Sequence, residues 1–236
     1  MVKDFVHFGD SYHTSLDAFP FTFGCVEEET NLFYSQAADG ILGMTKGNTN
    51  VHMMPIVDAM FDAHIIQQKI FSLCLGKNGG YFQIGGYDET SHLTPTVKWV
   101  PLLTNLAATP GYRIGIRGVE INGHLMAGTH TFDRALVDSG ATFTSVPRRL
   151  LKIISEHFDW FCMLDLQGHC KGRRIHKDKL YDDIICFNYN EKRFPMGPKD
   201  YFVSYPILSF MVPDTEGGIQ ALEWYPSEYL FRYKYD

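Results

Sequence analysis

The sequence predicts a mostly β protein, built as a sandwich or a barrel-like domain. First, 14% of the residues are aromatic and 21 residues are glycine, a combination that favours strands and turns over a bundle of helices. Second, the chain holds many short apolar runs separated by Gly, Asn, Asp and Pro, which is the pattern of strands joined by turns. Predicted strands therefore outnumber predicted helices.

The first half of the chain predicts a strand, a helix and a hairpin. The strand covers residues 19–25. The helix covers residues 55–66, because Pro is favoured at a helix start and apolar residues recur at helical spacing after it. The hairpin joins strands at residues 70–75 and 81–84, since the connection at 76–80 (GKNGG) contains Asn and Gly.

The second half predicts further strands and one more helix. The helix covers residues 147–158, again with Pro at its start, and Asn122-Gly123 predicts a tight turn. Residues 105–111 (NLAATPG) predict a linker, so we expect one domain at residues 1–104 and another at 112–236. The further strands are expected at residues 97–102, 112–116, 119–121, 135–137, 184–187, 201–204, 207–212 and 229–233.

Charge and hydropathy restrict the class of protein. Lys and Arg total 21 and Asp and Glu total 27, a net charge of −6, which argues against a nucleic-acid binder. Hydrophobic residues make up 45% of the chain, enough for a sizeable core. No stretch approaches about 18 uninterrupted apolar residues, so we expect no membrane segment in this chain. Residues 1–10 lack the pattern of a signal peptide.

The five cysteines bear on the redox compartment. Cys162, Cys170 and Cys186 lie near one another in the sequence, which fits a disulfide-bearing secreted or luminal protein. The absence of a signal peptide conflicts with this, and the conflict is resolved if the chain is a piece of a longer protein. With His169 and His176 these cysteines also offer a zinc site. Because their spacing is not that of a zinc finger, we expect no metal.

One segment predicts catalytic chemistry. Residues 135–144 (ALVDSGATFT) place Asp138 after an apolar strand, in a turn that contains Gly140. Because glycine lacks a Cβ, backbone N–H groups can approach the carboxylate closely, and such hydrogen bonds orient an Asp side chain. An Asp-Ser-Gly turn also joins strands in many β proteins with no catalytic role. The segment alone does not decide between these interpretations.

The segment resembles the second active-site loop of the pepsin-like aspartic proteases. Further segments match that family in the same order along the chain. They are residues 38–44 (ADGILGM), 71–75 (FSLCL), 80–88 (GYFQIGGYD), 99–102 (WVPL) and 112–114 (YRI). The resemblance implies an all-β, bilobal fold that is incomplete here, with the back part of the first lobe and most of the second.

Within the family, the chain is most similar to the plasmepsin V-like group of apicomplexan parasites. This similarity lies in residues 23–29 (FGCVEEE), 32–37 (LFYSQA) and 224–230 (WYPSEYL). It implies a location in the secretory pathway or the endoplasmic reticulum lumen. It also implies a monomer in the intact family member and a peptide or protein as substrate.

The family resemblance implies an aspartic endopeptidase that needs no cofactor. In that family each lobe gives one Asp, and the two carboxylates share a proton and activate a water molecule. Asp138 matches the second-lobe catalytic Asp. The first-lobe Asp-Thr/Ser-Gly loop is expected upstream of Asp39, and no residues there fit it. A catalytically inactive pepsin-like fragment that binds peptides or proteins is therefore the alternative.

The resemblance also assigns substrate-binding residues. These are Tyr112, Gly140, Ala141 and Thr142. Most family members have Ser or Thr where this chain has Ala141, so a hydroxyl that can hydrogen-bond the catalytic carboxylate is missing. The resemblance therefore implies a less acidic working range for this chain.

The remaining motifs receive simpler interpretations. The family has a disulfide in its second lobe, which implies a bond from Cys186 to Cys162 or Cys170. Cys25 and Cys74 are expected to pair in the intact protein with partners partly outside this chain. The basic run at residues 171–177 predicts a solvated loop.

Overall fold

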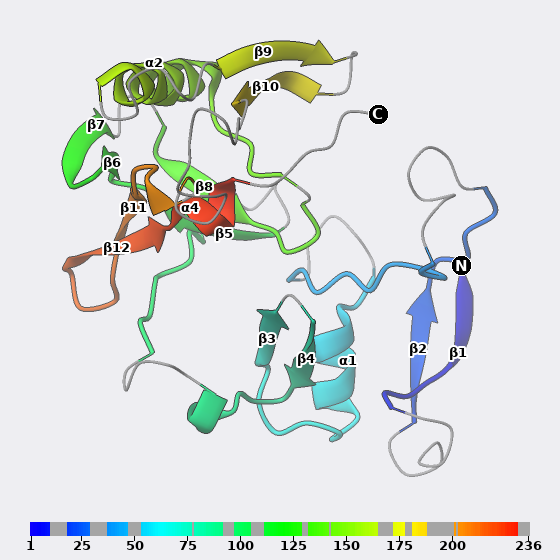
Figure 1. Ribbon diagram of the computed structural model, residues 1–236. Helices are drawn as coiled ribbons and strands as arrows, with labels where there is room; N and C mark the ends of the chain where they lie inside the picture. The colour runs from blue at the N-terminus through cyan, green and yellow to red at the C-terminus, as the bar shows by residue number, and fades with distance from the viewer. Residues whose placement is uncertain are drawn as a thin grey trace. The chain divides into compact units, whose positions relative to one another are not determined.

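The computed structural model describes residues 1–9, 18–28, 37–46, 53–76, 78–91, 97–104, 111–128, 132–141, 143–164, 172–177, 181–187, 201 and 203–230, with the backbone alone at 162, 172–177 and 181–187. The chain divides into two compact units (Figure 1). Unit 1 holds residues 1–97 and 104–112, and unit 2 holds residues 98–103 and 113–236. Strands dominate both, as the all-β prediction requires. The assignment of residues 1–104 and 112–236 to two protease lobes stays a prediction.

Unit 1 contains a short helix and two antiparallel two-stranded sheets among its described residues. Ile56 and Met60 of the helix are buried with Phe19 in one hydrophobic cluster. The elements are β1 (Val2–Val6) paired with β2 (Phe19–Phe23), α1 (Ile56–Asp62), β3 (Phe71–Gly76) paired with β4 (Gly79–Ile84), and a 3-10 helix (Glu89–Ser91).

Helix α1 follows the residues that the sequence singled out, but it is shorter than expected. Pro55 precedes the helix in an extended conformation, as its fixed φ favours. The helix ends at Asp62 and not at Ile66, because Ala63 caps it and His64 adopts a φ of 59°. A left-handed residue after the last turn stops helical hydrogen bonding.

Unit 2 is built around a four-stranded antiparallel sheet in the order β12-β11-β6-β7. Its described part also holds two further two-stranded sheets, β5-β8 and β9-β10, two named helices, and helical residues at Tyr201 and Val203. The strands are β5 (Tyr112–Gly115), whose first residue belongs to unit 1, β6 (Gly118–Ile121), β7 (His124–Gly128), β8 (Arg134–Val137), β9 (Gly172–Lys177), β10 (Tyr181–Phe187), β11 (Leu208–Pro213) and β12 (Ile219–Trp224), and the helices are α2 (Arg148–Leu164) and α4 (Pro226–Tyr229).

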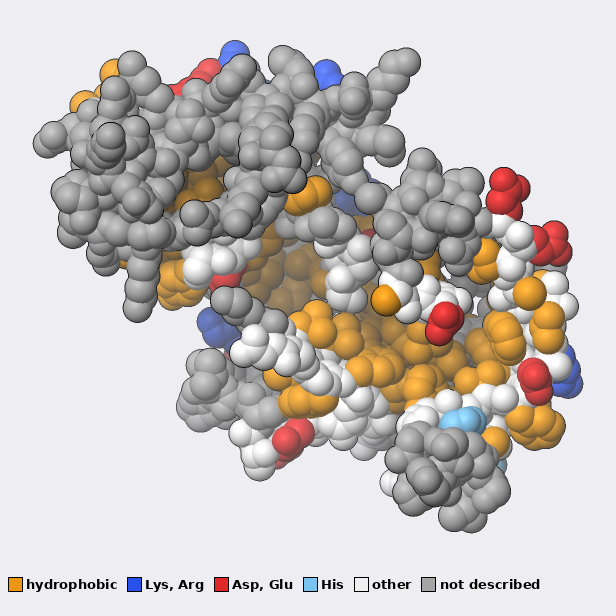
Figure 2. All heavy atoms as spheres, turned by 45° about the vertical axis from the view of Figure 1, so that its right-hand side comes forward, with side chains coloured by type: hydrophobic (Ala, Val, Ile, Leu, Met, Phe, Trp, Pro, Cys, Tyr) orange, Lys and Arg blue, Asp and Glu red, His pale blue; other side chains and the backbone are white. Residues whose placement is uncertain are grey.

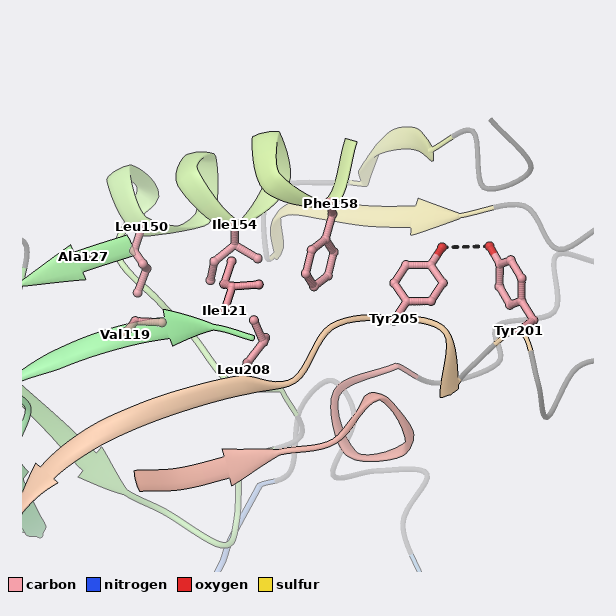
Figure 3. Packing of buried hydrophobic residues seen from close by; sticks show 9 residues of the cluster. All are labelled: Val119, Ile121, Ala127, Leu150, Ile154, Phe158, Tyr201, Tyr205 and Leu208. Carbon is pink, nitrogen blue, oxygen red and sulfur yellow. Dashed lines mark hydrogen bonds between the residues drawn. The ribbon is translucent and has the colours of Figure 1, made fainter. Parts of the chain in front are cut away.

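Helix α2 covers one face of the four-stranded sheet (Figure 3). Leu150, Ile154 and Phe158 recur every four residues, so they lie along one side of the helix. They pack against Val119 and Ile121 of the central strand β6. Val119 and Leu150 are fully buried, with 0% of their surface exposed.

A group of tyrosines closes one end of this core. The hydroxyl groups of Tyr201 and Tyr205 lie 2.8 Å apart (Figure 3). The ring centroids of Phe158 and Tyr205 lie 5.9 Å apart. Tyr229 donates a hydrogen bond to the carbonyl of Pro206. Burial raises the pKa of all three tyrosines, because an apolar site disfavours the charged phenolate.

Several element predictions are wrong. Of the strand expected at 97–102, only a single bridge from Leu102 to Ile114 forms. Tyr201 and Val203 are helical and not extended. The helical conformation brings the hydroxyls of Tyr201 and Tyr205 together. Four residues of strand would instead separate Tyr201 from Tyr205 by about 13 Å. Tyr229 ends helix α4, and residues 231–233 lie outside the described part.

Other elements were missed or misjudged. The basic run expected to be a loop forms strand β9, which pairs with β10. Strands β1, β7 and β12 were not predicted, and α2 extends to Leu164 instead of ending at Phe158. The physical reason is pairing: each missed strand is hydrogen-bonded to a partner from the described chain, and local residue preference does not reveal that partner.

Substituting Leu150→Ala tests the core under α2. The variant should lower the free energy of unfolding by about 2–5 kcal/mol, because it removes buried methyl groups and leaves a cavity. Urea unfolding followed by circular dichroism measures the change. Leu164→Ala is the matched control, since Leu164 lies on the same helix with 61% of its surface exposed and should change stability by less than about 0.5 kcal/mol. Equal effects of the two variants would contradict the described packing.

The buried tyrosines predict a loss of stability in alkali. Because their pKa values are raised in the folded state, their stabilising contribution is fully present below the unfolded-state pKa of about 10 and is lost as the pH rises toward the folded-state values. Tyr229→Phe removes one such group. The stability gap between this variant and wild type should therefore narrow between about pH 8 and about pH 11 in urea titrations. A difference in stability that stays constant over this pH range would contradict the raised pKa of Tyr229.

Candidate functional site

Strand β8, which ends directly before Asp138, is held by contacts near its start. Strand β8 pairs with β5, and Ala135 packs against a cluster of Ile114, Ile116 and Val212. The backbone N–H of Ile116 donates a hydrogen bond of 2.8 Å to the carbonyl of Asp133, just before the strand. These contacts hold the start of β8 against a buried cluster of unit 2.

The turn after β8 holds the carboxylate of Asp138 through its own backbone. Gly140 N–H donates a hydrogen bond to Asp138 Oδ1 at 2.9 Å. Ala141 N–H donates to the backbone carbonyl of Asp138 at 3.3 Å. One N–H group of the glycine-containing turn, that of Gly140, therefore approaches the carboxylate as predicted, whereas the N–H of Ala141 closes the turn on the backbone.

A side chain at position 140 would meet the carboxylate of Asp138. A Cβ built there would lie 3.2 Å from Asp138 Oδ1, closer than an ordinary van der Waals contact. Any larger residue would press on the carboxylate or displace it. A glycine here is thus matched to the close approach of backbone and side chain.

The surroundings of the turn are open and apolar. Asp138, Ser139 and Ala141 are exposed. Leu136, Val137 and Phe143, which flank the turn, are also exposed large hydrophobic residues. Asp133, at the far end of β8, pairs with Arg134 at 2.8 Å, and the hydrogen bond from that guanidinium lowers the pKa of Asp133. Asp138 is therefore presented at the surface beside apolar side chains.

Tyr112 is held by contacts within unit 1. Its hydroxyl donates a hydrogen bond of 2.9 Å to the carbonyl of Met44, and its ring packs on Phe71 with 5.7 Å between ring centroids. Burial raises the pKa of Tyr112. Since the hydroxyl already donates to Met44, a contact between Tyr112 and substrate would come from the ring or from a hydrogen bond that the hydroxyl oxygen accepts. The sequence offers no signal for the Met44 contact, which spans 68 residues.

The predicted site residues are thus only partly brought together. Asp138, Gly140 and Ala141 share one turn, whereas Tyr112 is described in the other unit. Thr142 lies outside the described residues. Their catalytic and substrate-binding roles stay predictions.

The cysteine predictions fall largely outside the described part. Cys170 and the side chains of Cys162 and Cys186 are not described, so the predicted disulfide stays a prediction. Cys25 and Cys74 are free and exposed. No group of three or more potential metal ligands occurs among the residues described. Within the same residues, no helix is both long and apolar enough to cross a membrane.

Comparison with known proteins identifies the family. The sequence profile described as eukaryotic aspartyl protease matches residues 2–204. The chain therefore belongs to the eukaryotic aspartyl protease family, as the segments around Asp138 and Asp39 predicted.

Individual relatives include parasite and vertebrate enzymes. The chain is 30% identical over 158 residues to aspartic protease 5 of Toxoplasma gondii, covering 52% of this chain and 16% of that protein. It is 30% identical over 139 residues to pepsin A of Gallus gallus, covering 57% of this chain and 36% of that protein. It is 24% identical over 186 residues to plasmepsin V of Plasmodium falciparum, covering 61% of this chain and 31% of that protein. Each match thus spans well under half of the relative's length.

Substituting Tyr112→Phe tests the link between Tyr112 and the segment that follows Asp39. Loss of the hydroxyl should lower the stability of the chain by about 1 kcal/mol, the usual net value of a hydrogen bond. Chemical denaturation measures the change. Tyr81→Phe is the control, because Tyr81 is exposed on β4 and its substitution should have little effect. The contact with Met44 would be unimportant if both variants matched wild type.

Proposed function

We propose that this chain carries the second-lobe half of an aspartic endopeptidase site, with Asp138 as one of two catalytic carboxylates. The observation that carries the proposal is the turn itself: an Asp at the end of an anchored strand, with Gly140 N–H on its carboxylate, in a chain of the eukaryotic aspartyl protease family. A peptide or protein is the substrate class that this assignment implies.

The chemistry requires a second carboxylate close to Asp138. Two carboxylates about 3 Å apart cannot both ionise, so one keeps a proton. The ionised carboxylate takes a proton from water as that water attacks the peptide carbonyl, and the protonated carboxyl polarises the carbonyl oxygen. The hydrogen bond from Gly140 would keep Asp138 oriented through this cycle.

The residues at the turn support substrate binding in distinct ways. Gly140 leaves space beside the carboxylate, and Ala141 presents a methyl group where a hydroxyl is common in the family. We propose that Ala141 and Thr142 border the substrate and that Tyr112 contributes its ring. A less acidic working range would follow from the missing hydroxyl, and it would suit a compartment of the secretory pathway.

One observation favours a second function. The 236 residues contain a single Asp-Ser-Gly and no other Asp-Thr/Ser-Gly, so this chain alone lacks the partner carboxylate. A protein with this feature could bind peptides without cutting them. The two functions differ in whether a peptide is hydrolysed or only retained.

Substitution of Asp138 decides between them. In a full-length gene product that carries these residues, Asp138→Asn should abolish peptide hydrolysis, because it removes the ionisable group and keeps its shape. A positioned acid or base contributes about 10²–10⁴-fold to the rate. Initial rates on a peptide library measure the loss. Asp133→Asn is the matched control, since Asp133 lies at the other end of the same strand and is exposed.

Three results would count against the proposal. Activity of the Asp138→Asn variant above about one hundredth of wild type would remove Asp138 from the mechanism. Hydrolysis by the 236-residue chain alone would show that no second carboxylate of the predicted kind is needed. Peptide binding without hydrolysis in the full-length product, unchanged by Asp138→Asn, would favour the binding function.

A further inference from the structure

The two strands of the small sheet β5-β8 are connected to the main sheet of unit 2 by linkers of different length. Strand β5 is followed by β6 after only two residues, Ile116 and Arg117. Strand β8 instead follows β7 after the five residues 129–133. A two-stranded sheet is only marginally stable by itself. The position of β8 therefore depends on side chains that pack near its start.

Phe132, two residues before β8, packs against both hydrophobic clusters of unit 2. One cluster is the core under α2, which contains Leu150. The other contains Val212, and Ala135 of β8 also packs against it. Among the described residues, Phe132 is the one partly buried side chain that contacts both clusters. Its ring thus connects the start of β8 with the core of the main sheet.

The other end of β8 lacks such packing. Hydrophobic side chains are widely exposed on the face of the molecule drawn in Figure 2, and Leu136 and Val137 are 47% and 56% exposed. Within the described part of the chain, neither packs against a buried cluster. Asp138 lies three residues, or about 10 Å of strand, beyond Ala135. A displacement of the packed start of β8 is therefore carried along the strand to Asp138.

We propose that Phe132 is a positioning residue for Asp138, because its ring holds the start of β8 against two clusters at once. This inference rests on the proposed function, in which Asp138 is one of two catalytic carboxylates. Removal of the ring leaves space into which the start of β8 can move. The two carboxylates must lie close together to share a proton, and a displacement of about 1 Å can lower a rate about a hundredfold.

The turn itself should survive such a displacement. The hydrogen bond from Gly140 to Asp138 joins two residues of one turn, so it moves with the strand. Ser139-Gly140 is the single Ser-Gly pair of the sequence. Labelling the serine carbonyl carbon and the glycine nitrogen of the 236-residue chain therefore selects the amide signal of Gly140 in a nuclear magnetic resonance spectrum. Phe132→Ala should retain this signal.

The kinetics of Phe132→Ala test the positioning role in a full-length gene product that carries these residues. We expect kcat per active site to fall by about tenfold to a hundredfold, with KM within about twofold of wild type. Active sites are counted with a tight-binding peptide inhibitor, so that unfolded molecules do not contribute. The pH range of activity should also become narrower, because carboxylates that move apart interact less as they titrate.

Two further variants separate positioning from stability. Leu150→Ala is the matched control, since Leu150 is fully buried and belongs to the core under α2. It should leave kcat per active site within about twofold of wild type. Phe132→Leu keeps apolar contacts at position 132 and should restore kcat to within about threefold of wild type. A Leu variant as slow as Phe132→Ala would count against packing as the cause.

Three other results would overturn the positioning role. They are a wild-type kcat and pH profile in Phe132→Ala, an equal loss of kcat in Leu150→Ala, and loss of the Gly140 signal in Phe132→Ala. Asp138→Asn, measured beside these variants, separates this inference from the proposed function. Activity of Asp138→Asn above about one hundredth of wild type would overturn both. An inactive Asp138→Asn with a wild-type rate in Phe132→Ala would overturn the positioning role alone.

Discussion

Strand β11 connects the two cores of unit 2, and the position of Asp138 depends on that connection. Leu208, near its start, packs in the core under α2. Val212, four residues later on the same face of the strand, packs with Ile114 and Ile116 beneath the start of β8. Because both side chains are buried, β11 cannot shift along its neighbours without opening one of the two cores. The anchored end of β8 is thus tied to the main sheet.

The turn at Asp138 combines a rigid support with an open surface. The strand before it is held through Ala135, and the carboxylate is oriented by a hydrogen bond from two residues further along. Around it, Leu136 and Val137 expose apolar surface. A functional group on a well-held strand end, with free space beside it, suits reaction or binding. Catalysis as half of a pair requires a second carboxylate close to that of Asp138.

Unit 1 shows the same contrast between covered and open surface. Phe71 lies at the covered end of the hairpin. Its ring contacts Tyr112, and the residue packs on the cluster around α1. Tyr112 in turn holds the backbone at Met44. Beyond Phe71, the hairpin turns its leucines to solvent. A two-stranded sheet alone is of marginal stability, so the packing at Phe71 is the part that keeps the hairpin attached.

Much of the fold and part of the site could be predicted from residue order alone. Short apolar runs and turn residues indicated the β class, and the paired strands at β3 and β4 followed from the Asn and Gly between them. The Asp-Ser-Gly after an apolar strand indicated the turn that the structure shows. These features are local: φ preferences, side-chain alternation and hydrogen bonds within a few residues determine them.

The tertiary structure decided what local preference could not. Strand β9 lies in a basic run that predicted a loop, and it forms because β10 pairs with it. Tyr201 is helical because its hydroxyl meets that of Tyr205. The hydrogen bond of Tyr112 joins residues that are 68 positions apart. In each case a partner elsewhere in the chain supplies the stabilising contact, so the sequence by itself determined the β class and the Asp138 turn, while packing and pairing over long separations determined the rest.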